Sequence, residues 1–230
     1  MKDEFIPTQN YQRMLALCNE LLGPALGVEI AAVVGRAGRG KTTAAEKIYT
    51  INDGTIYCLY REAWSHLELL REVTFRLSGM RPRTRSKCEE MIKSELANRR
   101  RIIMVDEADR MNLRCLNVLR NIHDDCNVPL LLIGEEALTA NLEAERRLIS
   151  RVRQTIAFGG VTQADVVVFF RKNLDQDLTP EQAGKVLKFS AGDFRRVLIA
   201  AVRAERIMGS SGIAKITDRI IDEAMKNGDR

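Results

Sequence analysis

A stretch of eight residues has the residue types and the spacing of a loop that binds phosphate. Residues 35–42 read Gly-Arg-Ala-Gly-Arg-Gly-Lys-Thr and fit the pattern G-x-x-x-x-G-K-[S/T]. The glycines let the backbone wrap closely around phosphate oxygens, and a helix that begins at Lys41 would direct its N–H groups at them. We expect Lys41 to reach the β- and γ-phosphates of a nucleotide and the Thr42 hydroxyl to ligate Mg²⁺. The residues expected to contact the nucleotide here are Gly35, Arg36, Ala37, Gly38, Arg39, Gly40, Lys41, Thr42 and Thr43.

Two adjacent acids follow a hydrophobic run farther along the chain. Residues 101–105 read Arg-Ile-Ile-Met-Val, and Asp106 and Glu107 come directly after them. A buried strand would deliver Asp106 to the carboxyl edge of a parallel sheet, where it can hold Mg²⁺ through water. Glu107 can then orient and polarise an attacking water. The pair favours hydrolysis over phosphate transfer to a small molecule, because a small-molecule kinase does not need the second acid.

Short aliphatic runs alternate with longer amphipathic patterns over the first 160 residues. This alternation is typical of a parallel α/β sheet with helices on both faces. The expected strands are Glu29–Val34, Thr55–Tyr60, Arg101–Asp106, Leu130–Gly134 and Gln154–Phe158. Only helical patterns follow after residue 160, and Thr179-Pro180-Glu181-Gln182 is a strong helix start. We predict an α/β nucleotide-binding core over residues 1–160, with a short helical segment at its amino end, and a small all-helical lid over residues 161–230.

The composition limits the class of protein. Lys and Arg total 36 against 31 Asp and Glu, which gives a net charge of +5 and an isoelectric point near 9.0. This charge permits binding to a polyanion but does not require it. No apolar run approaches the roughly 20 residues of a membrane span, and the five cysteines, which include no Cys-x-x-Cys pair, disfavour a zinc site. We expect a cytoplasmic protein that does not enter the membrane.

These motifs resemble those of the AAA+ ATPases, and the resemblance runs over nearly the whole chain. Within that superfamily the sequence is most similar to transposition proteins of the phage Mu B type and to the transposon ATPases TnsC, TniB and IstB. The stretches that carry the resemblance are Val33–Ala44, Ile103–Asp109, Leu119–Asp124 and Pro129–Gly134. The resemblance implies a P-loop NTPase fold, in which a parallel five-stranded sheet flanked by helices precedes a small all-helical lid.

Two further arginines match positions with roles in these ATPases. Arg151 lies in a stretch similar to the box that supplies an arginine finger to the neighbouring subunit, with Arg147 and Arg153 as alternatives. Arg195 lies in a stretch similar to the second sensor motif, which implies a contact with the γ-phosphate. The residues with implied catalytic roles are Lys41, Glu107, Arg151 and Arg195.

One position departs from the family pattern. The fourth strand of AAA+ proteins usually ends in Asn, Ser or Thr as the first sensor, whereas Gly134 stands here. Asn121 or His123 could substitute from the preceding helix, or this sensor is missing. Hydrolysis is then expected to be slow unless the oligomer, DNA or a transposase stimulates it.

Two basic clusters are candidates for contact with DNA, the first over residues 81–87 and the second over residues 99–101. No aromatic residue interleaves with either cluster, so we expect contacts with the phosphate backbone and little sequence preference. A solvated turn or a contact between subunits is the alternative interpretation. The candidate DNA-binding residues are Arg81, Arg83, Arg85, Lys87, Arg99 and Arg100.

The resemblance implies a DNA-binding ATP hydrolase that uses ATP and Mg²⁺ and regulates transposition in a bacterial or phage-infected cell. Its implied partners are duplex DNA, a DDE-type transposase and further copies of itself, with nucleotide at the subunit interfaces of a ring or a helical filament. Two rival hypotheses are a helicase loader of the DnaC or IstB type, which would favour single-stranded DNA, and a nucleotide-switched scaffold without DNA of the ExeA type.

Overall fold

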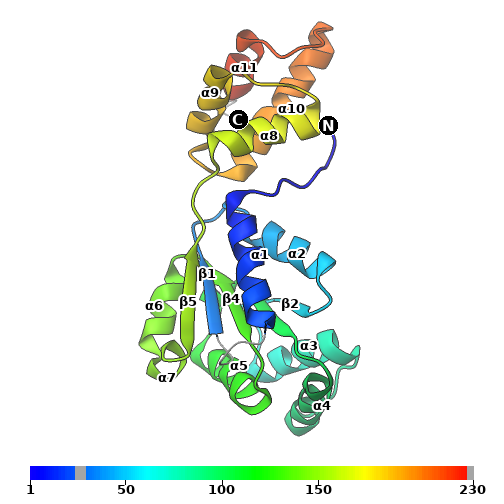
Figure 1. Cartoon of the computed structure of the whole chain (residues 1–230), viewed down its shortest axis with the longest axis vertical. Coiled ribbons are helices and arrows are strands. Elements are labelled where there is room, and N and C mark those ends of the chain that lie inside the picture. The colour runs from blue at the N-terminus through cyan, green and yellow to red at the C-terminus, as the bar shows by residue number, and fades with distance from the viewer. Residues whose placement is uncertain (24–29, 227–230) are drawn as a thin grey trace. The chain divides into compact units, whose positions relative to one another are not determined.

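The structure is a computed structural model that describes residues 1–23 and 30–226, and these residues form two compact units (Figure 1). The α/β core comprises Asn10–Arg36 and Lys41–Phe158. The helical unit comprises Met1–Gln9, Ala37–Gly40 and Gly159–Arg230. Each unit has a hydrophobic interior of its own, so each is described by itself.

The described part of the core contains a five-stranded, all-parallel sheet with the strand order β2-β3-β4-β1-β5. Its strands are β1 (Ile30–Val34), β2 (Thr55–Leu59), β3 (Ile102–Asp106), β4 (Leu130–Gly134) and β5 (Val152–Ala157). The three inner strands consist almost entirely of buried residues, as expected of parallel strands that helices cover on both faces. The predicted sheet is therefore confirmed. Glu29, the expected start of the first strand, lies outside the described residues.

The parallel direction of the strands brings several chain segments to one edge of the sheet. Val34 pairs with Gly134, and Leu59 pairs with Asp106. The loop that follows β1 and the acids that follow β3 therefore leave the sheet at the same edge. Ligands of open parallel sheets bind at this carboxyl edge.

Helices pack around the sheet (Figure 1), and two of them come between β2 and β3 in the chain. The core helices are α1 (Gln9–Leu22), α2 (Lys41–Ile51), α3 (His66–Ser78), α4 (Arg85–Asn98), α5 (Leu113–Cys126), α6 (Ala137–Ala144) and α7 (Arg146–Ile149), with a 3₁₀ turn at Ala108–Arg110. Ser65 and Glu68 form a capping box at the start of α3, and the Asn112 side chain caps α5. α3, α4 and α5 pack against one another and bury aliphatic residues between them.

The helical unit encloses a second hydrophobic interior. Its helices are α8 (Gln163–Leu174), α9 (Pro180–Ser190), α10 (Phe194–Ser211) and α11 (Asp218–Met225). The predicted start of α9 is confirmed, because Thr179 and Gln182 form a capping box and Pro180 occupies the first turn. Ile6 adds a side chain from the amino-terminal segment to this interior. Among the described residues, no helix combines the length and the apolar character that a membrane crossing requires.

Candidate functional site

The loop between β1 and α2 has a shape that depends on its glycines. Gly40 has a φ of 82°, a left-handed conformation that strains residues with a Cβ. At Gly35, a Cβ would lie 2.8 Å from the carbonyl oxygen of Phe158. Because α2 begins directly at Lys41, the N–H groups of its first turn, which includes Thr42 and Thr43, point back toward the loop. This arrangement is a ready site for an anion.

The Lys41 side chain lies along this loop. Its Nζ donates to the carbonyl oxygens of Gly35 at 2.5 Å and Arg36 at 3.0 Å, and the residue is only 9% exposed. Burial lowers the pKa of the Lys41 ammonium, whereas acids at the carboxyl edge, first among them Glu135, oppose this shift. These carbonyl groups hold the Lys41 ammonium in the loop. The ammonium can exchange its bonds to them for bonds to phosphate oxygens.

Asp106 ends β3 as a buried carboxylate with both oxygens occupied. The Tyr57 hydroxyl donates to Oδ2 at 2.9 Å, and the N–H of Glu107 donates to Oδ1 at 2.9 Å. Tyr57 comes from the neighbouring strand β2, and burial together with the Asp106 charge raises the pKa of its hydroxyl. The sequence alone does not single out Tyr57, because a tyrosine in an aliphatic strand has the pattern of a core residue.

The donor set at this edge suits Mg²⁺. The Asp106 carboxylate and the Thr42 hydroxyl offer the hard oxygen ligands that this ion prefers. The described residues contain no group of three or more His, Cys, Asp or Glu side chains that could cage a metal. Two protein oxygens would leave the other positions around an Mg²⁺ ion to phosphates and water.

Glu107 has an unusual backbone conformation. Its φ of 58° places it in the left-handed region, which a non-glycine residue occupies at a cost of about 1–3 kcal/mol. Its carboxylate pairs with Arg110, with 2.9 Å between Oε2 and Nε. Strain of this kind is concentrated at functional positions. The conformation turns the chain sharply after Asp106, so the two adjacent acids have different environments.

The departure at Gly134 has a structural cause. A Cβ at Gly134 would lie 2.5 Å from Oδ1 of Asp109 and 2.9 Å from its backbone nitrogen. The same Asp109 oxygen accepts a hydrogen bond from the Glu135 N–H at 2.9 Å. Asp109 thus occupies the space that a side chain at the end of β4 would need, and only glycine fits there.

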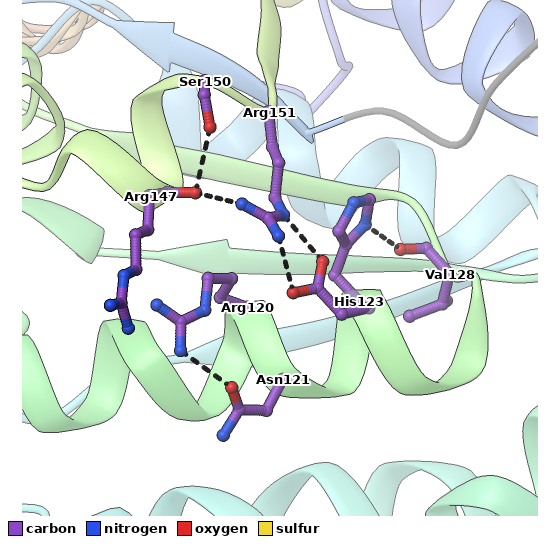
Figure 2. Close-up of polar contacts among 8 residues, drawn as sticks. Arg120, Asn121, His123, Val128, Arg147, Ser150 and Arg151 are labelled. Carbon is purple, nitrogen blue, oxygen red and sulfur yellow. Dashed lines mark hydrogen bonds and ion pairs between the residues drawn. The ribbon is translucent and has the colours of Figure 1, made fainter.

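The two residues considered as substitutes for the first sensor are engaged elsewhere (Figure 2). His123 Nδ1 lies 2.8 Å from the carbonyl oxygen of Val128, which precedes the amino end of β4. His123 is therefore near the end of β4 opposite to Gly134. The Asn121 side chain accepts a hydrogen bond from Arg120 at 3.0 Å.

Arg151 is held by contacts within its own chain (Figure 2). Its Nε and Nη2 donate to the two carboxylate oxygens of Asp124 at 2.7 and 2.9 Å. Its Nη1 donates to the backbone carbonyl of Arg147. Within residues 1–23 and 30–226, the guanidinium groups of the alternatives Arg147 and Arg153 form no hydrogen bond or ion pair. Arg151 is thus the fixed member of the three, while the other two are exposed.

The helical unit contains the other sequence-predicted arginine. Arg195 lies in the first turn of α10, where its N–H donates to the capping carboxylate of Asp193 at 2.8 Å, and its side chain is exposed. Residues 37–40 group with this unit, and the Gly38 carbonyl accepts a hydrogen bond from the Phe194 N–H at 2.9 Å. Gly38 itself has a φ of 75°. Arg39 donates to the Ala191 carbonyl at 3.3 Å.

Most residues of the first basic cluster are paired with acids. Arg81 donates to the buried Glu72 at 2.6 Å and lies over the Phe75 ring, 4.2 Å from its centroid. Burial would raise the pKa of Glu72, but the guanidinium groups of Arg76 and Arg81 hold it below its usual value. On α4, Arg85 pairs with Glu89 at 2.8 Å and Lys87 pairs with Glu90 at 3.0 Å.

Unpaired basic side chains are fewer than the sequence suggests. Arg83 is exposed in the turn before α4 and has no ion pair among the residues that the structure describes. Arg99 follows α4 and is also exposed and unpaired within that part of the chain. Arg100 donates to the Leu21 carbonyl at 3.2 Å. Among the six candidate DNA-binding residues, Arg83 and Arg99 are therefore the exposed ones whose side chains have no partner in the described ranges.

The fold and the site together define a class of protein. A glycine-rich loop joins the inner strand β1 to a helix, and a lysine lies along this loop. An acidic pair lies at the carboxyl end of β3, in a sheet with the strand order β2-β3-β4-β1-β5. This is the arrangement of a P-loop ATPase fold, which binds nucleotide. The model of the AAA domain family matches residues 27–142, which is half of the chain, and the chain belongs to this family.

The relatives include two phage proteins and one from a bacterium. The chain is 27% identical over 171 residues to the "ATP-dependent target DNA activator B" of Escherichia phage Mu and, at the same identity and length, to its counterpart in Escherichia phage D108. These matches cover 70% of this chain and 54% of each relative. A "potential ATP-binding protein" of Staphylococcus aureus is 26% identical over 132 residues, which covers 54% of this chain and 49% of that protein. The chain thus matches about half the length of these relatives.

Solved structures share the fold. The ORC2 protein of Aeropyrum pernix has a TM-score of 0.70 at 15% identity and covers 98% of this chain and 70% of its own. The Holliday junction branch migration motor RuvB of Thermotoga maritima has a TM-score of 0.68 at 17% identity, with 96% and 70% covered. The A. pernix ORC1 protein, solved in complex with DNA, has a TM-score of 0.66 at 19% identity, with 97% and 65% covered.

Proposed function

We propose that this protein is an ATP-dependent, largely sequence-nonspecific DNA-binding ATPase. It acts as a target selector and activator for a DDE-type transposase and assembles on duplex DNA as an ATP-dependent oligomer or filament. The observation that carries the proposal is the similarity to a target DNA activator over 70% of the chain. The phosphate loop and the acids after β3 support the ATP-dependent part of this function.

The side chains around the loop supply the parts of a hydrolytic site. Lys41 binds the β- and γ-phosphates once it releases the carbonyl oxygens of the loop. Thr42 and Asp106 would hold Mg²⁺, which would neutralise charge on the phosphates. Glu107, released from Arg110, orients the attacking water and accepts its proton. Arg195 is the proposed second sensor, which contacts the γ-phosphate.

Assembly follows if an arginine from a neighbouring copy completes the nucleotide-binding site. Arg151 is the candidate for this role, and an arginine supplied in trans contributes on the order of 10³–10⁵ in rate. Isolated subunits then hydrolyse ATP poorly, and contacts of this head-to-tail kind close into a ring or continue as a filament. ATP thereby favours the assembled state, and hydrolysis disassembles it.

Contact with DNA in this proposal comes from exposed basic side chains on the core. Arg83 and Arg99 are the first candidates because neither is paired with an acid in the described ranges. Arg81, Arg85, Lys87 and Arg100 remain proposed contacts, and each must weaken an existing interaction to bind a phosphate. The binding is expected to weaken steeply with salt, because phosphate contacts release counterions.

The test is binding to duplex and single-stranded DNA with a non-hydrolysable ATP analogue, with ADP and without nucleotide, at several salt concentrations. We expect tight, salt-sensitive binding to duplex only with the analogue. Equal binding in all three nucleotide states refutes ATP-dependent assembly. A preference for single strands supports the helicase loader instead, and the absence of any binding supports a scaffold without DNA.

Two variants sharpen this test. Arg83→Ala should weaken duplex binding and reduce the salt dependence by about one phosphate contact, whereas Arg85→Ala, which removes a residue already paired with Glu89, should weaken it less. Glu107→Gln should retain ATP binding and stay on duplex DNA after an ATP chase. Rapid release of this variant would contradict the role given to Glu107.

A further inference from the structure

Arg151 belongs to a small charged face on the core that includes α5 and the turn after α7. Asp124 accepts two hydrogen bonds from Arg151, and the pair is about one third exposed on both sides. Arg120 precedes Asp124 by four residues on α5 and therefore lies on the same side of that helix. Arg147 lies one turn before Arg151 (Figure 2). Among these described side chains the positive charges outnumber the single carboxylate, so the face remains attractive to an anion.

The contacts of Arg151 fix its orientation without using all its donors. A guanidinium has five N–H donors. Within the described residues, Arg151 donates from Nε and Nη2 to Asp124 and from Nη1 to the Arg147 carbonyl, one bond from each nitrogen. Donors on both terminal nitrogens therefore stay available while the side chain is held. The Ser150 hydroxyl donates to the same Arg147 carbonyl at 3.2 Å, which ties this turn together.

We propose that Asp124 is a positioning residue, which holds Arg151 in the orientation needed to donate to the γ-phosphate of ATP bound to a neighbouring copy of this chain. This inference rests on the proposed function, because it needs nucleotide at a subunit interface. The pair remains intact when the phosphate arrives, since the remaining N–H donors of Arg151 reach it. Asp124 therefore acts on the reaction only through Arg151 and does not touch the nucleotide.

The physical reason lies in preorganisation. A free arginine must lose the rotational freedom of a long side chain when it binds, whereas a bidentate carboxylate fixes the planar guanidinium beforehand. A misplacement of about 1 Å in a catalytic arrangement can reduce a rate about 100-fold. Loss of Asp124 should therefore lower the rate in the assembled state rather than the affinity for ATP.

The experiment compares Asp124→Asn with Asp125→Asn. Asp125 is the next residue on α5 and pairs with Lys93 at 3.0 Å, so its replacement removes an equivalent surface ion pair. ATP turnover is measured against protein concentration with saturating ATP and duplex DNA, and ATP binding is measured on dilute protein. We expect Asp124→Asn to lower the turnover at saturating protein by about 10- to 100-fold with unchanged ATP binding, and Asp125→Asn to change it less than about twofold.

A double-mutant cycle with Arg151→Ala separates positioning from a purely structural role. If Asp124 acts through Arg151, Asp124→Asn causes no further loss in the Arg151→Ala background. Asp124→Glu, which keeps the charge, should restore part of the turnover. The inference is overturned if Asp124→Asn causes equal losses of turnover in the wild-type and Arg151→Ala backgrounds. It is also overturned if turnover rises in Asp124→Asn, which would mean that the carboxylate had restrained the arginine. Failure of the proposed function itself is distinct, since the wild-type protein would then show no dependence of turnover on protein concentration.

Discussion

The hydroxyl of Tyr57 offers a defined test of how the acidic edge of the sheet is held. The change Tyr57→Phe removes one oxygen atom and leaves Asp106, which is 1% exposed, with a single donor among the described residues, the N–H of Glu107. A hydrogen bond to a charged group contributes about 1.5–3 kcal/mol, and a buried carboxylate that loses a donor is costly to leave unsatisfied. We expect the free energy of unfolding of the core to fall by about this amount at neutral pH.

Urea unfolding followed by circular dichroism measures this loss, with Tyr49→Phe as the control. The rings of Tyr49 and Tyr57 lie next to each other, with 6.2 Å between their centroids, but Tyr49 is 42% exposed. Its replacement should change the stability by less than about 0.5 kcal/mol. A second measurement compares the ATP affinity in the presence of Mg²⁺ with that in the presence of a chelator. Tyr57→Phe should make the Mg²⁺-dependent increase in ATP affinity about tenfold smaller. If the two variants unfold at the same urea concentration, the Tyr57 hydroxyl does not stabilise the folded core through Asp106.

Two further changes test other contacts at the site and beside it. Gly134→Ala should destabilise the core by about 1–3 kcal/mol, because the new Cβ would overlap Asp109, whereas Gly209→Ala, in α10 with open space around it, should be neutral or stabilising in the same thermal unfolding assay. Glu72→Gln should be most destabilising at neutral pH. The folded-state pKa of Glu72 is depressed, so its contribution is present above the ordinary value of 4.5 and is lost as the pH falls through the lower folded value. The free energies of unfolding of the wild-type protein and of Glu72→Gln should therefore converge in acid. A difference that stays constant with pH would contradict the role of Arg76 and Arg81.

The parts of the molecule that follow from local sequence were predictable. The strands were recognisable because parallel strands buried on both faces must be aliphatic, and the helix at Thr179 because its capping residues are adjacent in the chain. The phosphate loop was recognisable because its function requires consecutive backbone groups. In each case the residues that cause the structure lie within one short segment.

The contacts that depend on distant residues could not be read from the sequence. Asp124 and Arg151 are 27 positions apart, and their pairing requires α5 and the turn before β5 to be neighbours. The basic cluster at residues 81–87 looked like an open polyanion site, but Glu72, Glu89 and Glu90 neutralise much of it. The steric reason for Gly134 was also out of reach, because the Asp109 that fills the space beside it comes from an earlier segment of the chain.

The discontinuous make-up of the helical unit has a practical consequence for dissecting the molecule. Lys2 pairs with Asp175, the Asn173 side chain bonds to the backbone of Glu4, and Ile6 fills part of the interior between the helices. A fragment that starts at Gly159 would therefore expose an apolar hollow and two unpaired polar groups. Simple truncation is therefore unsuited to isolating the helical unit. A circularly permuted gene, in which a linker joins the end of the chain to its amino-terminal segment, is better suited.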